Sequence, residues 1–297
     1  MLIVGCILAI VVGVTIGAFQ STKPTTAEVA RAQARYQKAH DQCMSGAYLG
    51  GEPLPPGFIS LQDYCDRTVE FQVNAGLKTA DLVAAVQGSA TFVILIGVIL
   101  AASLGGADWS SGTMTTLLTW EPRRVRVLVV RALVITLFVF VITFVVQALF
   151  VGAFSLAASL RGWTGGTPPG LAEDVVRNMA RVSTMAVAIG LVALSIATVG
   201  RSTVAALGVL FGYLVLFEGV IAGFAPSTQD KLLVRAAGVV VSRQPIYDFR
   251  EPSTGVIGNM IEPRVLLGLG EAWLVVGFYV VALVGLALVV FRSRDVN

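Results

Sequence analysis

Long apolar segments recur along the chain, and they constrain its fold more than any other feature of the sequence. Each is long enough to cross the hydrocarbon core of a bilayer as a helix, which takes about 20 apolar residues. Hydrophobic residues make up 56% and charged residues 13%, whereas soluble globular proteins contain about 45–50% and about 25%. We therefore predict an all-α integral membrane protein with six transmembrane helices, at residues about 2–19, 83–105, 125–152, 182–200, 203–224 and 268–291.

The arginines near the ends of these segments predict the orientation of the chain. Three connections carry them and, with six spans, all three lie on one side of the membrane, which the positive-inside rule makes the cytoplasm. These arginines are Arg123, Arg124 and Arg126 between the second and third spans, Arg201 between the fourth and fifth, and Arg292 and Arg294 after the sixth. We expect a multi-pass cell-membrane protein with both termini cytoplasmic.

The first apolar segment is expected to stay in the protein as a span. It has no basic residues ahead of it and no small-residue cleavage site, which a secretory signal would have.

The connection at 20–82 is expected to fold outside the membrane as a helical hairpin. Thr25 and Glu28 have the spacing of a capping box, which marks the start of a helix. Cys43 and Cys65 lie on either side of a turn rich in glycine and proline, and an oxidising compartment would allow them to pair. Two unpaired thiols remain the alternative.

Another outer connection, 225–267, contains the apolar run 231–241, which is too short to cross the membrane. We expect a helix there that lies in the membrane interface.

Small residues recur at four-residue spacing within the spans, as in Gly97, Ala101 and Gly105, and in Gly208 and Gly212. This spacing places them on one helix face, where they permit close contact between helices in lipid.

The sequence offers no equipment for catalysis. It contains no phosphate-binding loop, no H-E-x-x-H metal motif and no G-x-S-x-G nucleophile motif. The only histidine, His40, is expected on the surface of the outer hairpin, and neither a metal site nor a Cys-His nucleophile has enough partners. We expect no enzyme activity, no cofactor and no nucleic-acid binding, since no basic face carries interleaved aromatic residues.

The cytoplasmic connection at 106–124 is the stretch whose sequence points to a partner. Met114, Leu117 and Leu118 fall on one face of a short helix, which Pro122 ends. One interpretation is an interfacial connector that separates two spans. The other is a docking element for a soluble protein.

Here the sequence resembles the first cytoplasmic loop of type-2 ATP-binding cassette (ABC) permeases, the export class. The residues that carry the resemblance are Asp108, Gly112, Thr113, Leu117, Leu118, Pro122 and Arg123. The resemblance implies that residues 1–297 form a single permease domain, that a separate nucleotide-binding subunit holds ATP and Mg²⁺, and that a second permease copy or a paralogue completes the path.

In that family the loop forms a coupling helix that sits in a groove of the ATPase subunit. The resemblance therefore implies that Met114, Leu117 and Leu118 contact the ATPase, and that polar contacts come from Asp108, Glu121, Arg123 and Arg124. The sequence departs from the family in two ways: no basic segment precedes the first span, and Asp108 stands where the family more often has glutamate.

Two carboxylates within the predicted spans are candidates for lining the transport path, because charged side chains in hydrocarbon cost about 2.5–3.5 kcal/mol on insertion scales. Glu218 lies late in the fifth span, and Glu271 lies at the start of the sixth. The alternative is that each carboxylate caps a helix or forms a contact between helices.

Two other kinds of protein remain as alternatives. A polytopic scaffold or sensor would bind a partner through the same loop without moving a solute. A secondary transporter is less favoured, because the spans lack several buried charges that could relay protons or bind sodium.

Overall fold

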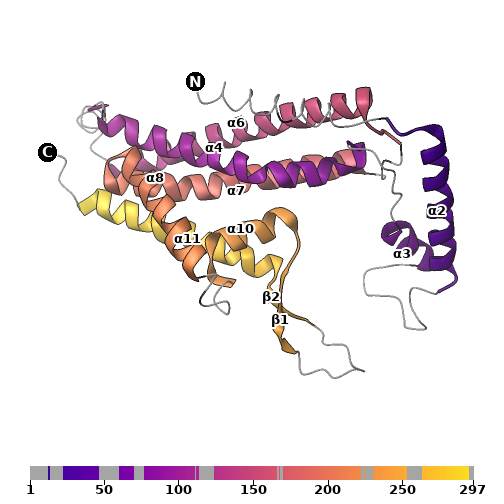
Figure 1. The fold of residues 1–297 in the computed structure, drawn as a ribbon. Coiled ribbons are helices and arrows are strands. Elements are labelled where there is room, and N and C mark those ends of the chain that lie inside the picture. The colour runs from indigo at the N-terminus through magenta and orange to yellow at the C-terminus, as the bar shows by residue number, and fades with distance from the viewer. Residues whose placement is uncertain are drawn as a thin grey trace. The chain divides into compact units, whose positions relative to one another are not determined.

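The computed structural model is an all-α membrane protein with one small β-hairpin (Figure 1). It describes residues 13, 23–46, 60–69, 77–110, 112–113, 124–165, 167, 170–221, 224, 230–252 and 263–293. Among these residues, five helices are long and apolar enough to cross a membrane, and they correspond to the second to sixth predicted spans. The first predicted span lies outside the described residues, apart from Gly13.

The chain divides into two compact units, described separately below: residues 1–82 with 149–171, and residues 83–148 with 172–297. We call them unit 1 and unit 2.

Unit 1 contains the predicted outer hairpin, with helices α2 (Thr26–Met44) and α3 (Leu61–Thr68). The capping box at the start of α2 is confirmed: the Glu28 backbone N–H donates to Thr25 Oγ1 at 3.3 Å, and the Thr25 N–H donates to Glu28 Oε2 at 2.8 Å. The hydrogen bond from the Thr25 N–H holds the pKa of the Glu28 carboxyl below its ordinary value.

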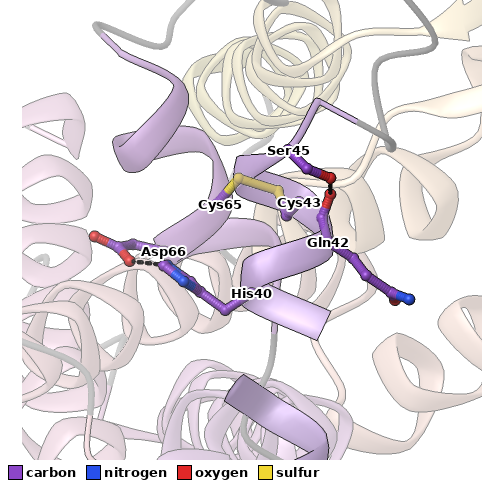
Figure 2. The surroundings of a disulfide bond; sticks show 6 residues. All are labelled: His40, Gln42, Cys43, Ser45, Cys65 and Asp66. Atoms are coloured by element: carbon purple, nitrogen blue, oxygen red, sulfur yellow. Dashed lines mark hydrogen bonds and ion pairs between the residues drawn. A yellow bond between two sulfur atoms is a disulfide. The ribbon is translucent and has the colours of Figure 1, made fainter. Parts of the chain in front are cut away.

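A disulfide joins Cys43, in the last turn of α2, to Cys65 in α3, so the structure contains the pairing that the sequence left open (Figure 2). Beside it, His40 Nε2 lies 2.9 Å from Asp66 Oδ1, and the His40 ring stacks on Tyr36. The Ser45 hydroxyl donates to the Gln42 carbonyl at 2.7 Å and closes the end of α2. The single histidine therefore has a structural role between the two helices.

The two outer segments of unit 1 meet through their backbones. The Trp163 N–H donates to the Leu77 carbonyl at 2.9 Å, and the Thr79 N–H donates to the Trp163 carbonyl at 3.0 Å. Thr79 begins the short 3₁₀ helix η1 (Thr79–Asp81). The residues before the second predicted span are thus tied to the residues after the third.

Unit 2 is built on three long helices that pass side by side in Figure 1. They are α4 (Leu82–Ser110), α6 (Arg124–Arg161, whose last residues belong to unit 1) and α7 (Leu171–Gly200). The predicted spans were too short for two of them, because α6 runs nine residues past 152 and α7 begins eleven residues before 182. Hydropathy marks the part of a helix that lies in lipid. Helix α7 begins before that part with polar residues such as Glu173 and Arg177, and α6 continues past it to Arg161.

The remaining elements of unit 2 follow α7. They are α8 (Thr203–Gly212), the π-helix η2 (Tyr213–Ile221), α10 (Leu233–Ser242), strands β1 (Ile246–Pro252) and β2 (Pro263–Leu267), and α11 (Leu269–Ser293). The short apolar helix expected within 231–241 is therefore present as α10, and it packs against α11.

The antiparallel hairpin of β1 and β2 was not predicted. The alternation of aromatic and charged residues from Tyr247 to Arg250 is the strand signal that was missed.

Helices α4 and α7 run parallel and touch through small residues. A Cβ atom on Gly97 would lie 3.0 Å from the Ala186 Cβ, and one on Gly105 would lie 2.7 Å from Leu194 Cδ1. The predicted role of this four-residue pattern in close helix contact is confirmed for α4. At Gly208 and Gly212 of α8, an added Cβ meets nothing within 4 Å, so the same pattern makes no close contact there.

Candidate functional site

Trp109, in the last turn of α4, lies where the predicted coupling loop begins. The Arg201 guanidinium carbon lies 4.8 Å from the centre of the Trp109 ring, and the Phe291 ring meets it edge-on with centroids 6.1 Å apart. Trp109 thus packs against the turn after α7 and the last turns of α11. A cation over a tryptophan face is attracted by the ring quadrupole, which fixes this turn against α4.

The turn between α7 and α8 is itself tightly constrained. Arg201 adopts the left-handed conformation, with φ 52°, and the Ser202 hydroxyl accepts the Ala205 N–H at 3.4 Å to begin α8. Gly106 of α4 lies so close to this turn that an added Cβ would be 2.4 Å from the Thr203 backbone nitrogen. The end of α4 and the start of α8 therefore leave no room for a side chain between them.

Helix α6 joins the same cluster from the other end of the predicted loop. Leu128 packs with Phe291, and the Arg131 guanidinium donates to the carbonyls of Leu104 and of Gly105, the latter at 3.1 Å. An arginine beside the carbonyls of a helix's last turns also stabilises the negative end of the helix dipole. Arg131 therefore connects α6, the helix after the loop, to the end of α4, the helix before it.

We call this group the loop-end cluster, defined by Trp109, Leu128, Arg131, Arg201 and Phe291. It brings together the ends of α4, α6, α7 and α11. The sequence predicts three arginine-bearing connections on one side of the membrane. All three begin or end at the loop-end cluster of unit 2.

The described residues of the predicted coupling loop lie at its two edges. Gly112 adopts φ 71°, where glycine is favoured, and its N–H lies 3.4 Å from the Trp109 carbonyl, so that it ends α4. Thr113 is exposed, and Arg124 is the first residue of α6. Asp108 lies in the last turns of α4, but its side chain is outside the described part. Outside the described residues altogether are Met114, Leu117, Leu118, Glu121, Pro122 and Arg123.

Glu218 caps the start of another helix, α10. Its Oε1 accepts the Val234 backbone N–H at 2.7 Å, and the Tyr213 hydroxyl accepts the neighbouring Leu233 N–H at 3.2 Å. These two N–H groups belong to the first turn of α10, where a helix has no internal acceptors. Tyr213 also bonds the Tyr279 hydroxyl of α11, which donates to the Lys231 carbonyl at 3.2 Å. The π-helix η2 therefore holds the start of α10.

Glu271 caps its own helix. Its Oε2 accepts the Gly268 backbone N–H at 3.0 Å, three residues earlier, which is half of a capping box at the start of α11. For both carboxylates, the described contacts are those of the helix-capping alternative.

Sequence reasoning did not identify Trp109 or Arg131 as site residues. A signal for Arg131 was present, because it is an arginine seven residues into α6 within the apolar span predicted at 125–152. Such a residue marks a function or a specific partner by default. No comparable signal in the sequence indicated that Trp109 would meet Arg201 and Phe291.

The described residues contain no group of three or more histidine, cysteine, aspartate or glutamate side chains that could hold a metal ion. Comparisons of the chain with protein-family models, with curated proteins and with solved structures give no match.

Proposed function

We propose that this chain is the membrane-spanning permease subunit of an ABC exporter. A separate nucleotide-binding subunit hydrolyses ATP, and the loop at 106–124 docks on that subunit. Two permeases, identical or paired with a paralogue, enclose the path. The proposed topology has six spans and both termini in the cytoplasm.

The observation that carries the proposal is the loop-end cluster. The loop leaves α4 just after Trp109 and enters α6 just before Leu128 and Arg131, and these residues contact the α7–α8 turn and α11. A displacement of the loop is therefore passed to several spans at once. A docking loop that drives a transport cycle needs such a connection, whereas a passive connector between two helices does not.

The tight contact between α4 and α7 supports the same interpretation. Because Gly97 and Gly105 lie against Ala186 and Leu194 without a gap, α4 cannot move along its length without moving α7. The few described charges inside the spans favour a hydrophobic or amphipathic cargo.

The test is co-purification of the full chain with an ABC nucleotide-binding subunit encoded beside it. Leu117→Asp and Arg123→Glu should separate the two proteins and abolish the stimulation of ATP hydrolysis in lipid. Arg235→Glu, a charge reversal on the exposed face of α10, is the matched control and should leave both unchanged. Undiminished co-purification and stimulation in both loop variants would overturn the proposed role of the loop. Binding without any effect of ATP on transport would favour the scaffold or sensor.

A further inference from the structure

A polar contact joins α6 to α7 within the apolar parts of both helices. Gln147 of α6 is fully buried, and its Nε2 donates to Ser183 Oγ at 2.9 Å and to the Met179 carbonyl at 3.1 Å, both in α7. Ser183 is fully buried as well. Gln147 lies in the predicted span at 125–152, and Ser183 lies in the one at 182–200. Polar groups at such a depth find their hydrogen-bond partners inside the protein or on a bound molecule.

The oxygen of the same amide, Gln147 Oε1, is buried but accepts no hydrogen bond within the part of the chain that the structure describes. The hydroxyl of Thr143, one turn earlier in α6, cannot supply one, because it donates to the Val139 carbonyl at 2.7 Å. Turning the amide over does not help. Its oxygen would then face the Met179 carbonyl, and its nitrogen would have no acceptor. In either orientation, one atom of the Gln147 amide needs a further partner.

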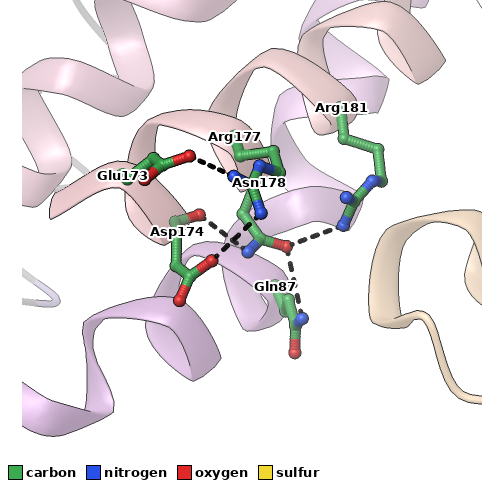
Figure 3. A network of polar contacts seen from close by, with 6 residues as sticks. All are labelled: Gln87, Glu173, Asp174, Arg177, Asn178 and Arg181. Atoms are coloured by element: carbon green, nitrogen blue, oxygen red, sulfur yellow. Dashed lines mark hydrogen bonds and ion pairs between the residues drawn. The ribbon is translucent and has the colours of Figure 1, made fainter. Parts of the chain in front are cut away.

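Asn178 shows how a fully satisfied amide looks at the same end of α7. Its side chain is buried, with 6% exposed, and its Nδ2 donates to the Asp174 carbonyl at 2.9 Å. Its Oδ1 accepts from Gln87 Nε2 of α4 at 3.4 Å and from the Arg181 guanidinium at 3.2 Å (Figure 3). Both polar atoms of Asn178 therefore have partners within the protein, whereas only the nitrogen of Gln147 has them among the described residues.

The polar beginning of α7 brings solvent close to the Gln147 contact. Arg177 is exposed there, and it pairs with Glu173 and, at 3.5 Å, with Asp174 (Figure 3). Met179, whose carbonyl accepts from Gln147, is two residues beyond Arg177, which is about 3 Å along an α-helix. A small molecule from the solvent therefore has only a short distance to cover along α7.

We infer that the Gln147 amide holds a water molecule between α6 and α7, and that this water donates a hydrogen bond to Oε1. An unpaired acceptor in apolar surroundings costs more free energy than the immobilisation of one water molecule. Buried waters are typically found at such atoms. The Ser183 hydroxyl accepts one bond from the amide and has capacity for a further bond to the same water.

The chemistry of the contact favours water over a cation. No carboxylate within the described ranges contacts the Gln147 amide, so nothing there compensates a buried positive charge. The contact between α6 and α7 at this level is therefore polar and hydrated, whereas α4 meets α7 through small apolar residues. The inference does not depend on the proposed transport function.

The test uses the full chain, isotope-labelled and reconstituted in lipid bilayers. Solid-state NMR measures the transfer of magnetisation from water protons to individual residues. In the wild-type protein, the Gln147 side-chain amide and Ser183 should receive magnetisation from water. Thr198 is the reference within α7, because it is 5% exposed and its hydroxyl donates to the Leu194 carbonyl at 2.8 Å. Transfer to Gln147 and Ser183 no greater than that to Thr198 would overturn the inference.

A variant of Gln147 tests whether the amide holds the water. Gln147→Met removes the amide and keeps a side chain of similar length that suits an apolar span, so transfer to Ser183 should fall to the level at Thr198. Thr184→Val is the matched control. It removes a hydroxyl from the exposed side of α7, one residue from Ser183, and should leave the transfer unchanged. If Ser183 receives as much magnetisation in Gln147→Met as in the wild type, the amide does not hold the water. The comparison within the wild type decides even if the variant does not fold.

Discussion

The guanidinium of Arg201 lies over the ring of Trp109, 4.8 Å from its centre, although ninety-two residues separate them in the chain. This contact joins the end of α4 to the turn between α7 and α8. Arg201 also adopts a left-handed backbone with φ 52°. The contact of its side chain with Trp109 therefore stabilises the protein, whereas its backbone conformation destabilises it.

Substitutions at Arg201 should separate these two effects. Arg201→Ala loses the stacking and keeps the unfavourable backbone, whereas Arg201→Gly loses the stacking and relieves the backbone. We expect the alanine variant to be the less stable of the two by about 1 kcal/mol. The measurement is the thermal unfolding midpoint in detergent. Equal midpoints would mean that the backbone at position 201 is not strained.

Gly106→Ala should destabilise the protein by about 1–3 kcal/mol, as is typical of overpacking. The new Cβ would lie 2.4 Å from the Thr203 nitrogen, which is backbone and cannot rotate away. Gly88→Ala is the matched control, because it is in the same helix and its Cβ would meet nothing within 4 Å. The control should be neutral or stabilising by up to about 1 kcal/mol. Similar unfolding midpoints for both variants would contradict the close packing of α4 against the α7–α8 turn.

Variants of Glu218 distinguish helix capping from a role in the transport path. Glu218→Ala removes the acceptor for the Val234 N–H and should raise hydrogen exchange at the start of α10 about tenfold or more. Glu218→Gln keeps a side-chain oxygen as the acceptor and should raise exchange much less. A path that needs the negative charge predicts the other pattern, in which the glutamine variant loses transport while hydrogen exchange in α10 is unchanged.

Loss of the Cys43–Cys65 disulfide should destabilise the outer hairpin. The bond closes a loop with a sequence separation of 22, for which the chain-entropy model gives about 3 kcal/mol. Cys43→Ser should therefore speed proteolysis within α2 and α3 and leave hydrogen exchange in α7 unchanged. His40→Ala, which removes only the contact with Asp66, should have a smaller effect, because partly exposed ion pairs contribute about 0–1 kcal/mol.

The sequence predicted the elements whose signals are local. The apolar spans follow from hydropathy, the start of α2 from the spacing of Thr25 and Glu28, and the contact face of α4 from the spacing of Gly97 and Gly105. Each signal depends on residues that are close in the chain. The same local spacing at Gly208 and Gly212 makes no close contact, because a sequence shows which face of a helix is small but not which helix will face it.

The candidate site depends on contacts between distant segments, and few signals in the sequence indicate such contacts. Trp109 meets Arg201 and Phe291, and Glu218 meets Val234, only after the helices have packed. Glu218 shows why an ionisable residue in a span is ambiguous when only the sequence is known. A carboxylate that binds a backbone N–H and one that faces a path occur in the same apolar surroundings.

The π-helix η2 explains how one helix can hold two successive N–H groups of α10. Tyr213 and Glu218 are five residues apart. At the 3.6 residues per turn of an α-helix they would point about 140° apart, and only one of them could reach α10. The i→i+5 pattern of a π-helix places them one turn apart on the same face. The position of α10 therefore depends on the π-helical winding between Tyr213 and Glu218. An ordinary α-helix over the same residues would leave both side chains unchanged in kind and still release one of the two bonds.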